Sequence, residues 1–162
     1  LSSSLSDLGR REEALAACEE ASELYRQLAA ARPDAFRPDL AMSLNNLSNR
    51  LSDLGRREEA LAACEEASEL YRQLAAARPD AFRPDLATSL NNLSNRLSDL
   101  GRREEALVLS EEAVRTLSPY FIAYPAAFRN WMTVMVRIYR WNAEQAGQAP
   151  DENLLNPVLE LL

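Results

Sequence analysis

Residues Leu51–Arg96 read LSDLGRREEALAACEEASELYRQLAAARPDAFRPDLATSLNNLSNR, and the preceding stretch, Leu5–Arg50, repeats this sequence with a single difference. Met42 in the earlier copy is replaced by Thr88 in the later one. A third copy begins at Leu97 with LSDLGRREEAL and then diverges. A repeat of this length predicts a solenoid, in which each unit buries its apolar face only by stacking on the next unit.

The four glycines of the chain keep the register of the repeat, because each lies 46 residues after the one before. This register predicts a repeat array over residues 1–147 and a C-terminal capping segment at 148–162. The array comprises a partial unit at 1–8 and units at about 9–54, 55–100 and 101–147, and the partial unit suggests a piece of a longer array. Glycine directly after the last apolar residue of a helix favours a helix end, which we expect at Gly9, Gly55, Gly101 and Gly147.

Each unit is expected to hold two antiparallel helices. Apolar residues recur every three or four positions between Arg11 and Ala31, which is typical of an amphipathic helix. Proline interrupts helices, so Pro33 and Pro38 predict a connector, followed by a shorter helix from about Pro38 to Leu54. The second copy predicts a long helix at Arg57–Ala77, a connector through Pro84 and a shorter helix at Asp85–Leu100.

The third unit is the least regular. Pro119 predicts that its first helix ends or kinks there. A second helix is expected near residues 126–146, covered on more than one side and in part by the tail, which holds a short helix interrupted near Pro157. An aromatic set in this region fits either a capping core or an apolar docking surface. Its members are Phe121, Tyr124, Phe128, Trp131, Tyr139 and Trp141.

Composition excludes several classes of function. The net charge is −7 and all 18 basic residues are arginine, which disfavours nucleic-acid binding and favours a partner whose surface is basic or at least not acidic. Histidine and lysine are absent, so the commonest general base, the imidazole metal ligand and the Schiff-base amine are missing. We therefore predict no enzyme, no catalytic residue, no cofactor and no metal site. Paired acids such as Glu12 with Glu13 are expected on a solvated, salt-bridged outer face.

Neither a membrane span nor a signal peptide is predicted from the sequence, because no apolar run is long enough. Cys18 and Cys64 occupy the same position in successive units, where a small, half-buried residue fits. Reduced thiols at these two positions favour a cytoplasmic protein.

The residues on both sides of the turn at Gly55 resemble the signature of the tetratricopeptide repeat family, and the segment LGRREEAL is especially similar to it. The residues at the spacing of the family signature are Ala41, Leu44, Leu47, Ser48, Leu51, Leu54, Gly55, Ala60, Cys64 and Ala67. The unit is longer than usual and is similar to the repeats of kinesin light chains and of bacterial signalling ATPases. The resemblance implies an all-α, right-handed superhelix of antiparallel helix pairs, whose shorter helices line a concave groove that binds extended peptides or partner helices.

Asparagines on the shorter helix suggest the same groove. Asn45 and Asn49 lie on one helix face, although asparagine is unfavourable inside a helix. An amide both donates and accepts hydrogen bonds, so a ladder of amides can pair with a peptide backbone; alternatively, the amides pair with neighbouring helices or water. The candidate groove residues are Met42, Asn45, Asn46, Asn49, Asp53, Thr88, Asn91, Asn92, Asn95, Asp99, Arg137 and Trp141.

Two functions follow from this interpretation. The first is a non-catalytic module that binds a peptide, a helix or a neighbouring domain, as part of a larger bacterial signalling or regulatory protein. The alternative is a structural element that self-associates by stacking its repeat ends into a homo-oligomer. Neither nucleic acid nor a membrane is expected as a partner.

Overall fold

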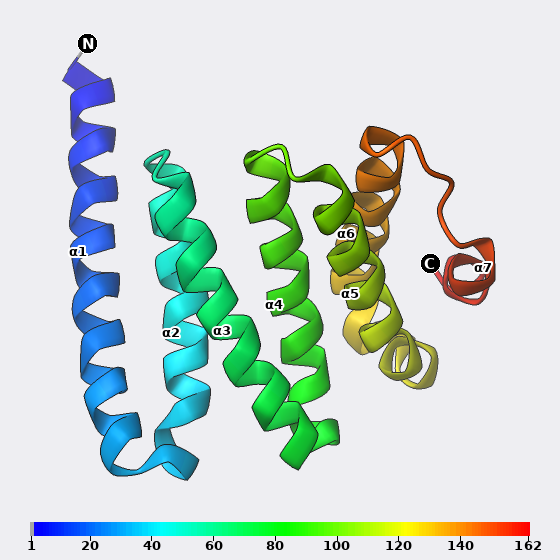
Figure 1. The fold of residues 1–162 in the computed structure, drawn as a ribbon, viewed down its shortest axis with the longest axis horizontal. Helices are drawn as coiled ribbons and strands as arrows, with labels where there is room; N and C mark the ends of the chain where they lie inside the picture. Colours follow the sequence, from blue (N-terminus) through cyan, green and yellow to red (C-terminus); the bar gives the residue numbers. More distant parts are fainter. Residues whose placement is uncertain (1) are drawn as a thin grey trace. The chain divides into compact units, whose positions relative to one another are not determined.

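The computed structural model describes residues 2–162, with side chains from residue 7 onward. These residues form seven α-helices and no strand, which confirms the all-α class (Figure 1). The helices are α1 (Ser2–Ala31), α2 (Pro33–Asp53), α3 (Arg57–Ala77), α4 (Pro79–Asp99), α5 (Arg103–Ala123), α6 (Pro125–Gln145) and α7 (Glu152–Leu159).

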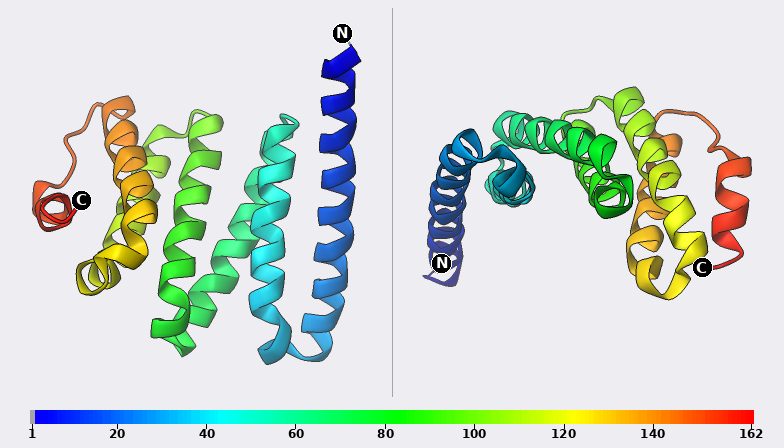
Figure 2. Two further views of the ribbon diagram at one scale, coloured as in Figure 1. Left: turned by 180° about the vertical axis from the view of Figure 1, so that it is seen from behind. Right: turned by 90° about the horizontal axis from the view of Figure 1, so that it is seen from below.

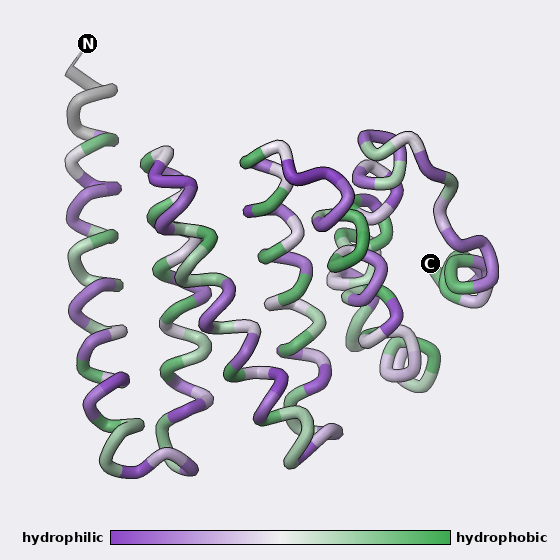
Figure 3. Tube along the Cα trace, viewed as in Figure 1, coloured by the Kyte–Doolittle hydropathy of each residue, from purple (hydrophilic) through white to green (hydrophobic). Residues whose placement is uncertain are grey.

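The helices form two compact units, residues 1–74 and 75–162, and α3 runs from the first unit into the second. Within the units consecutive helices pack in pairs, α1 on α2, α4 on α5 and α5 on α6. Figure 1 shows α1 and α2 side by side and running in opposite directions. In Figure 3 hydrophobic and hydrophilic residues alternate along the helices, as expected for amphipathic helices. The expected solenoid of helix pairs is thus confirmed, and the hand of its superhelix stays a prediction.

The core of the first unit combines leucines with alanines, which let helices approach closely. One buried cluster contains Leu15, Leu51, Ala60 and Ala63, and a second contains Ala29, Leu40, Leu44 and Ala67. Buried hydroxyls are satisfied locally: the hydroxyls of Ser22 and Ser43 lie 2.8 Å apart, and that of Ser48 donates to the Ala60 carbonyl oxygen at 2.7 Å. The repeat sequence therefore places α1, α2 and the start of α3 around shared clusters.

The core of the second unit uses larger side chains. Its fully buried members include Leu90, Val114, Leu117, Phe121, Met132 and Tyr139. Burial of each such apolar side chain stabilises the fold by roughly 1.5–3 kcal/mol. The divergence of the third copy thus produces a bulkier core around α5 and α6.

Three glycines end helices as predicted. At the end of α4, Gly101 has a φ of +75° and its N–H donates to the Ser98 carbonyl, while the Arg102 N–H donates to the Leu97 carbonyl, both at 2.9 Å. This pair of bonds is the Schellman arrangement, which requires a left-handed residue. Gly55 has a φ of +74° and makes the same turn after α2, and Gly147 follows α6 with a φ of +66°.

The expected helix end at Gly9 is wrong, because α1 continues through this residue and Gly9 has no positive φ. A glycine inside a helix costs only about 1 kcal/mol relative to alanine. The turn at Gly55 is held by the packing of α2 and α3 into one core, whereas Gly9 lies partly exposed within a single helix. Without such packing, local helix formation prevails.

The expected connectors at Pro33–Pro38 and Pro79–Pro84 are also wrong. Arg32 alone separates α1 from α2, and α2 begins at Pro33. Proline is tolerated in the first turn of a helix, where its missing N–H has no intrahelical acceptor. The helices α2 to α6 therefore all contain 21 residues, so the candidate groove does not lie on shorter helices.

Pro119 and Pro157 do not interrupt their helices. Pro119 lies inside α5, which continues to Ala123, and Pro157 lies inside α7. Proline removes one helical hydrogen bond, but the neighbouring residues Leu117 and Phe121 are fully buried and hold the α5 backbone on both sides of it. Tertiary packing thus overrides the local preference.

The C-terminal helix α7 packs on α5, and Figure 2 shows α7 next to the pair formed by α5 and α6. Asp151 caps its N-terminus by accepting from the Asn153 N–H at 2.9 Å. The Tyr139 hydroxyl accepts from the Asp151 N–H at 2.7 Å and donates to the Glu111 carboxylate at 3.2 Å. Burial raises the pKa of Tyr139, and the backbone hydrogen bond from Asp151 partly offsets this.

Candidate partner-binding surfaces

In the first unit the candidate residues follow α2. Met42, Asn46 and Asp53 are exposed, whereas Asn45 and Asn49 are half-buried. The Cys64 thiol donates to the Asn45 side-chain oxygen at 3.9 Å, and the Asp53 carboxylate pairs with Arg50 at 3.3 Å. This face of α2 is therefore largely polar and accessible to a partner. Asn45 also contacts a neighbouring helix, which agrees with the alternative that the amides pair within the protein.

In the second unit the corresponding residues follow α4. Asn91 is buried, Thr88, Asn92 and Asn95 are half-buried, and Asp99 is exposed. The Thr88 hydroxyl donates to the Pro84 carbonyl at 3.3 Å, and Asp99 lies 3.8 Å from the guanidinium of Arg96. Burial raises the pKa of Asp85, one turn before Thr88. This face is thus more buried on α4 than on α2, and Asn91 is its buried amide.

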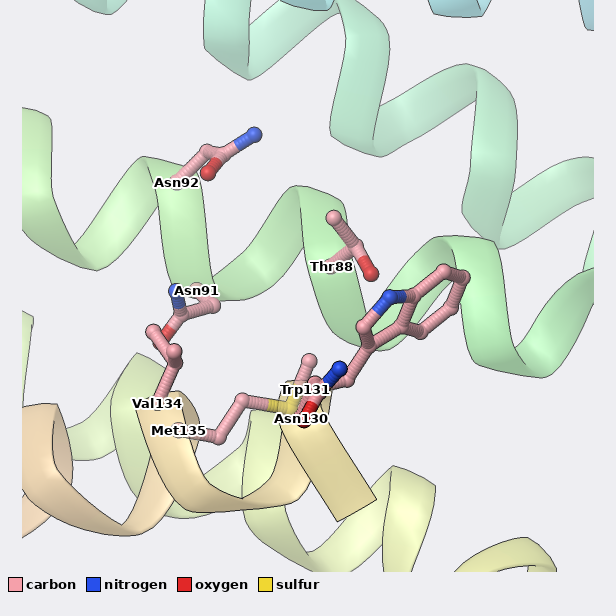
Figure 4. Close-up of a pocket in the computed structure, with 7 residues that line it drawn as sticks. All are labelled: Thr88, Asn91, Asn92, Asn130, Trp131, Val134 and Met135. Carbon is pink, nitrogen blue, oxygen red and sulfur yellow. The ribbon is translucent and has the colours of Figure 1, made fainter. Parts of the chain in front are cut away.

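A pocket of about 290 Å³ lies between α4 and α6. Its lining joins three predicted residues of α4 with four residues of α6, as Figure 4 shows. These residues are Thr88, Asn91, Asn92, Asn130, Trp131, Val134 and Met135. The α6 wall combines three apolar side chains with the amide of Asn130, and the α4 wall carries two amides and the hydroxyl of Thr88. The lining contains no charged side chain. Such a cleft suits a neutral group with both an apolar and a polar part.

Asn91 is the unusual member of this lining. Its side chain is only 7% exposed, and its Oδ1 atom is buried without a hydrogen-bond partner in the structure. In Figure 4 the Asn91 amide is directed towards α6 at Val134. A buried acceptor without a partner costs about 1–3 kcal/mol, so buried polar atoms are normally paired.

Four residues of the pocket were not among the sequence-predicted site residues: Asn130, Trp131, Val134 and Met135. The repeat register contained a signal for one of them, since Val134 occupies the position of Met42 and Thr88 in the earlier copies. The same register predicted Arg137 and Trp141, which are both exposed on α6 but do not line the pocket. Asn95 and Asp99 also lie outside it.

The aromatic set divides between the core and the surface. Phe121 and Tyr139 are buried, whereas Tyr124, Trp131 and Trp141 are exposed. The helix α6 contacts both α5 and α4, so it is covered on more than one side, as expected, while Trp131 and Trp141 stay exposed. The tail packs mainly on α5, where Leu155 and Val158 of α7 are buried. It also contacts α6, since Arg129 donates to the Leu162 carbonyl at 2.6 Å.

Acidic residues on the helix surfaces form ion pairs rather than a metal site. Arg56 donates to Glu59 at 2.7 Å and lies 3.7 Å from Glu19, and Arg102 donates to Glu105 at 2.7 Å. These hydrogen bonds lower the pKa of Glu59 and Glu105. Within the part of the chain that the structure describes, no group of three or more acidic, cysteine or histidine side chains is placed to hold a metal ion. The paired acids belong to a solvated face, as expected.

Helix pairs in series, with a polar face and an apolar pocket, define a helical-repeat protein. Family profiles described as tetratricopeptide repeat match residues 39–118 and residues 1–31, which together make up more than half of the chain. The chain therefore belongs to the tetratricopeptide repeat family, whose members are generally non-catalytic modules for protein–protein interaction. Comparison with curated proteins gave no significant match. Among the described residues, no helix combines the length and the apolarity that a membrane span requires.

Proposed function

We propose that the protein is a non-catalytic interaction module that binds a peptide, a helix or a neighbouring domain through the amide-bearing faces of α2 and α4. The observation that carries this proposal is the pair of partly exposed amides on α4, Asn92 and Asn95, beside the pocket between α4 and α6. A partner that approaches along α4 can pair with the half-buried amides Asn92 and Asn95 while one of its groups enters the pocket.

The first test measures how much the amide face of each unit contributes to peptide binding. A peptide that binds the wild-type protein would be selected from a random displayed library and synthesised, and its affinity measured by calorimetry. We expect the double substitution Asn92→Ala with Asn95→Ala to weaken binding about tenfold or more, because two amide hydrogen bonds are lost. The substitutions Asn45→Ala with Asn49→Ala report on the face of α2 in the same way.

The matched control removes two amides from α7, Asn153→Ala with Asn156→Ala, which are both exposed and lie outside the proposed faces. Its affinity for the peptide should equal that of the wild type. Unchanged affinity in both of the other double variants, with helical content intact, would refute the assignment of the binding face.

We further propose that the module works in the cytoplasm as part of a bacterial signalling or regulatory protein, with residues 1–147 as the repeat array and 148–162 as its cap. The thiols of Cys18 and Cys64 are not joined in a disulfide, which supports a reducing compartment. The burial of Leu155 and Val158 of α7 supports a capping role for the last segment.

Self-association is a second candidate function, favoured by the outer face of α1. Leu24 and Leu28 of α1 are exposed, although Leu70, the counterpart of Leu24 in α3, packs against a buried cluster of the first unit. Stacking of another copy on α1 would bury the same leucines. Sedimentation velocity should then show concentration-dependent association that Leu24→Glu with Leu28→Glu abolishes; a strict monomer at all concentrations would exclude this function.

A further inference from the structure

We infer that one face of α1 is a docking site for an amphipathic helix of the α2 type, supplied by another protein. This open face consists of Ala14, Ala17, Cys18, Ala21 and Leu24. The inference rests on the proposed function, since the protein would bind this helix as an interaction module. It adds a surface outside the amide-bearing faces of α2 and α4, and it defines the occupant by the residues that the helix must carry.

Identical sequences form α1 and α3, but this face is covered only in α3. Residues Arg11–Ala31 of α1 match Arg57–Ala77 of α3 at every position. In α3 the residues of this face are at most 8% exposed: Ala60, Ala63, Cys64 and Ala67. Their counterparts in α1 are all accessible, Ala17 fully and the other three partly: Ala14, Ala17, Cys18 and Ala21. The open face of α1 is thus a chemical copy of a surface that another helix buries in the same protein.

The helix that covers this face in α3 is α2. Leu51 of α2 shares a buried cluster with Ala60, and Leu40 and Leu44 share another with Ala67. Alanines let the leucines approach the α3 backbone closely, so both helices gain dispersion contacts and remove apolar surface from water. A helix with leucines at the same spacing would find the same alanines on α1.

Two polar contacts fix the position of α2 along α3. The Ser48 hydroxyl donates to the Ala60 carbonyl oxygen at 2.7 Å. The Cys64 thiol donates to the Asn45 side-chain oxygen at 3.9 Å. The carbonyl and the thiol both have counterparts on the open face of α1, because the sequence is the same. The occupant should therefore carry a serine and an asparagine between its leucines, at the spacing of α2.

A second copy of this chain does not offer such a helix. In each copy the corresponding leucines of α2 and α4 are already buried. In the register of the repeat, α6 carries Arg137 and Arg140 in place of Asn45 and Ser48, and both arginines are exposed. Placing these charges against the alanines of α1 would cost desolvation that the neutral side chains of α2 avoid. A helix of another protein is therefore the preferred occupant.

The test uses a synthetic peptide with the sequence of α2, PDAFRPDLAMSLNNLSNRLSDL, residues 33–54. An isolated helix of this length is marginal in water, so the peptide would be titrated to saturation. Cys18 reports on the open face, because it is partly exposed whereas Cys64, under α2, is 0% exposed. The full chain would be alkylated with iodoacetamide, and the modification of each cysteine followed by mass spectrometry.

The expected result is protection of Cys18. With the peptide at about ten times its dissociation constant, alkylation of Cys18 should slow about tenfold, because only the free fraction of the protein reacts. Cys64 is the internal reference, since its side chain is already covered and its rate should not change.

Matched variants of both partners locate the contact. In the full chain, Ala21→Glu places a charge on the open face and should abolish the protection, whereas Ala16→Glu, on the exposed opposite side of α1, should keep it. In the peptide, Leu44→Glu should abolish the protection of Cys18, whereas Met42→Glu, at a position that is 52% exposed in α2, should keep it. The peptide pair requires no change in the protein, so it decides the question even if Ala21→Glu perturbs the fold.

Each outcome decides the inference. If saturating peptide leaves the alkylation of Cys18 unchanged, or if the Leu44→Glu peptide protects as well as the parent peptide, the inference fails. It also fails if Cys18 becomes protected without peptide as the protein concentration rises, because a second copy then occupies the face. The proposed function is judged separately by the selected peptide: loss of its binding in the Asn92 and Asn95 variant supports that function whatever happens at Cys18.

Discussion

Replacement of Ala67 by glutamate should lower the free energy of unfolding by about 3–5 kcal/mol, because the carboxylate would be buried without a partner. Ala67 of α3 is fully buried in a cluster with Ala29, Leu40 and Leu44. The larger side chain would also force these close-packed neighbours apart, which adds to the cost. Urea denaturation followed by circular dichroism would measure the change.

The repeat provides an internal control for this substitution. Ala21 occupies the same position in α1, and the surrounding 21 residues, Arg11–Ala31, are identical to those of α3. Ala21 is partly exposed, so Ala21→Glu should cost less than about 1 kcal/mol. Equal losses of stability in the two variants would contradict the burial that the structure assigns to this face of α3.

Phe121→Ala is the second substitution with a large expected effect, a loss of about 3–5 kcal/mol. Phe121 is fully buried in α5, and its removal would leave a cavity in the core of the second unit. The earlier copies carry Ala29 and Ala75 at this position. The third unit has therefore adapted its core to the larger ring.

The neighbouring residue is the matched control for Phe121. Ile122 is 48% exposed, so Ile122→Ala should change the free energy of unfolding by no more than about 1 kcal/mol. Both variants would be measured by urea denaturation, with the m value compared to confirm that the same surface is exposed on unfolding. A larger loss for Ile122→Ala than for Phe121→Ala would show that the core of the second unit is assigned wrongly.

Helix positions could be predicted from the repeat where local and tertiary preferences agree. The predicted range Arg57–Ala77 is that of α3, and the turns at Gly55 and Gly101 were found as expected. The predicted helix ends were wrong where a glycine or proline lies inside a helix that tertiary packing stabilises, or where a proline lies in the first turn of a helix. Gly9, Pro38 and Pro119 are all helical, since each costs at most a few kcal/mol and burial on either side outweighs this where the helix is packed.

The candidate site could be predicted only on the side formed by α4. The register of the repeat placed Thr88, Asn91 and Asn92 on one helix face, and all three line the pocket. The opposite wall, with Trp131 and Val134, could not be assigned from α6 alone, because apolar residues cover more than one face of that helix. Which of those faces contacts α5 and which borders α4 depends on packing.

The sequence alone determined the repeat, the pairing of helices and the turns at Gly55 and Gly101, because these depend on periodicity and local backbone preference. Only the tertiary structure decided which copy of a residue is buried. Cys18 and Ala21 are partly exposed in α1, whereas Cys64 and Ala67, in an identical sequence, are fully buried in α3. The physical reason is that burial is a property of the neighbouring helices that cover a residue, and identical segments of this chain have different neighbours.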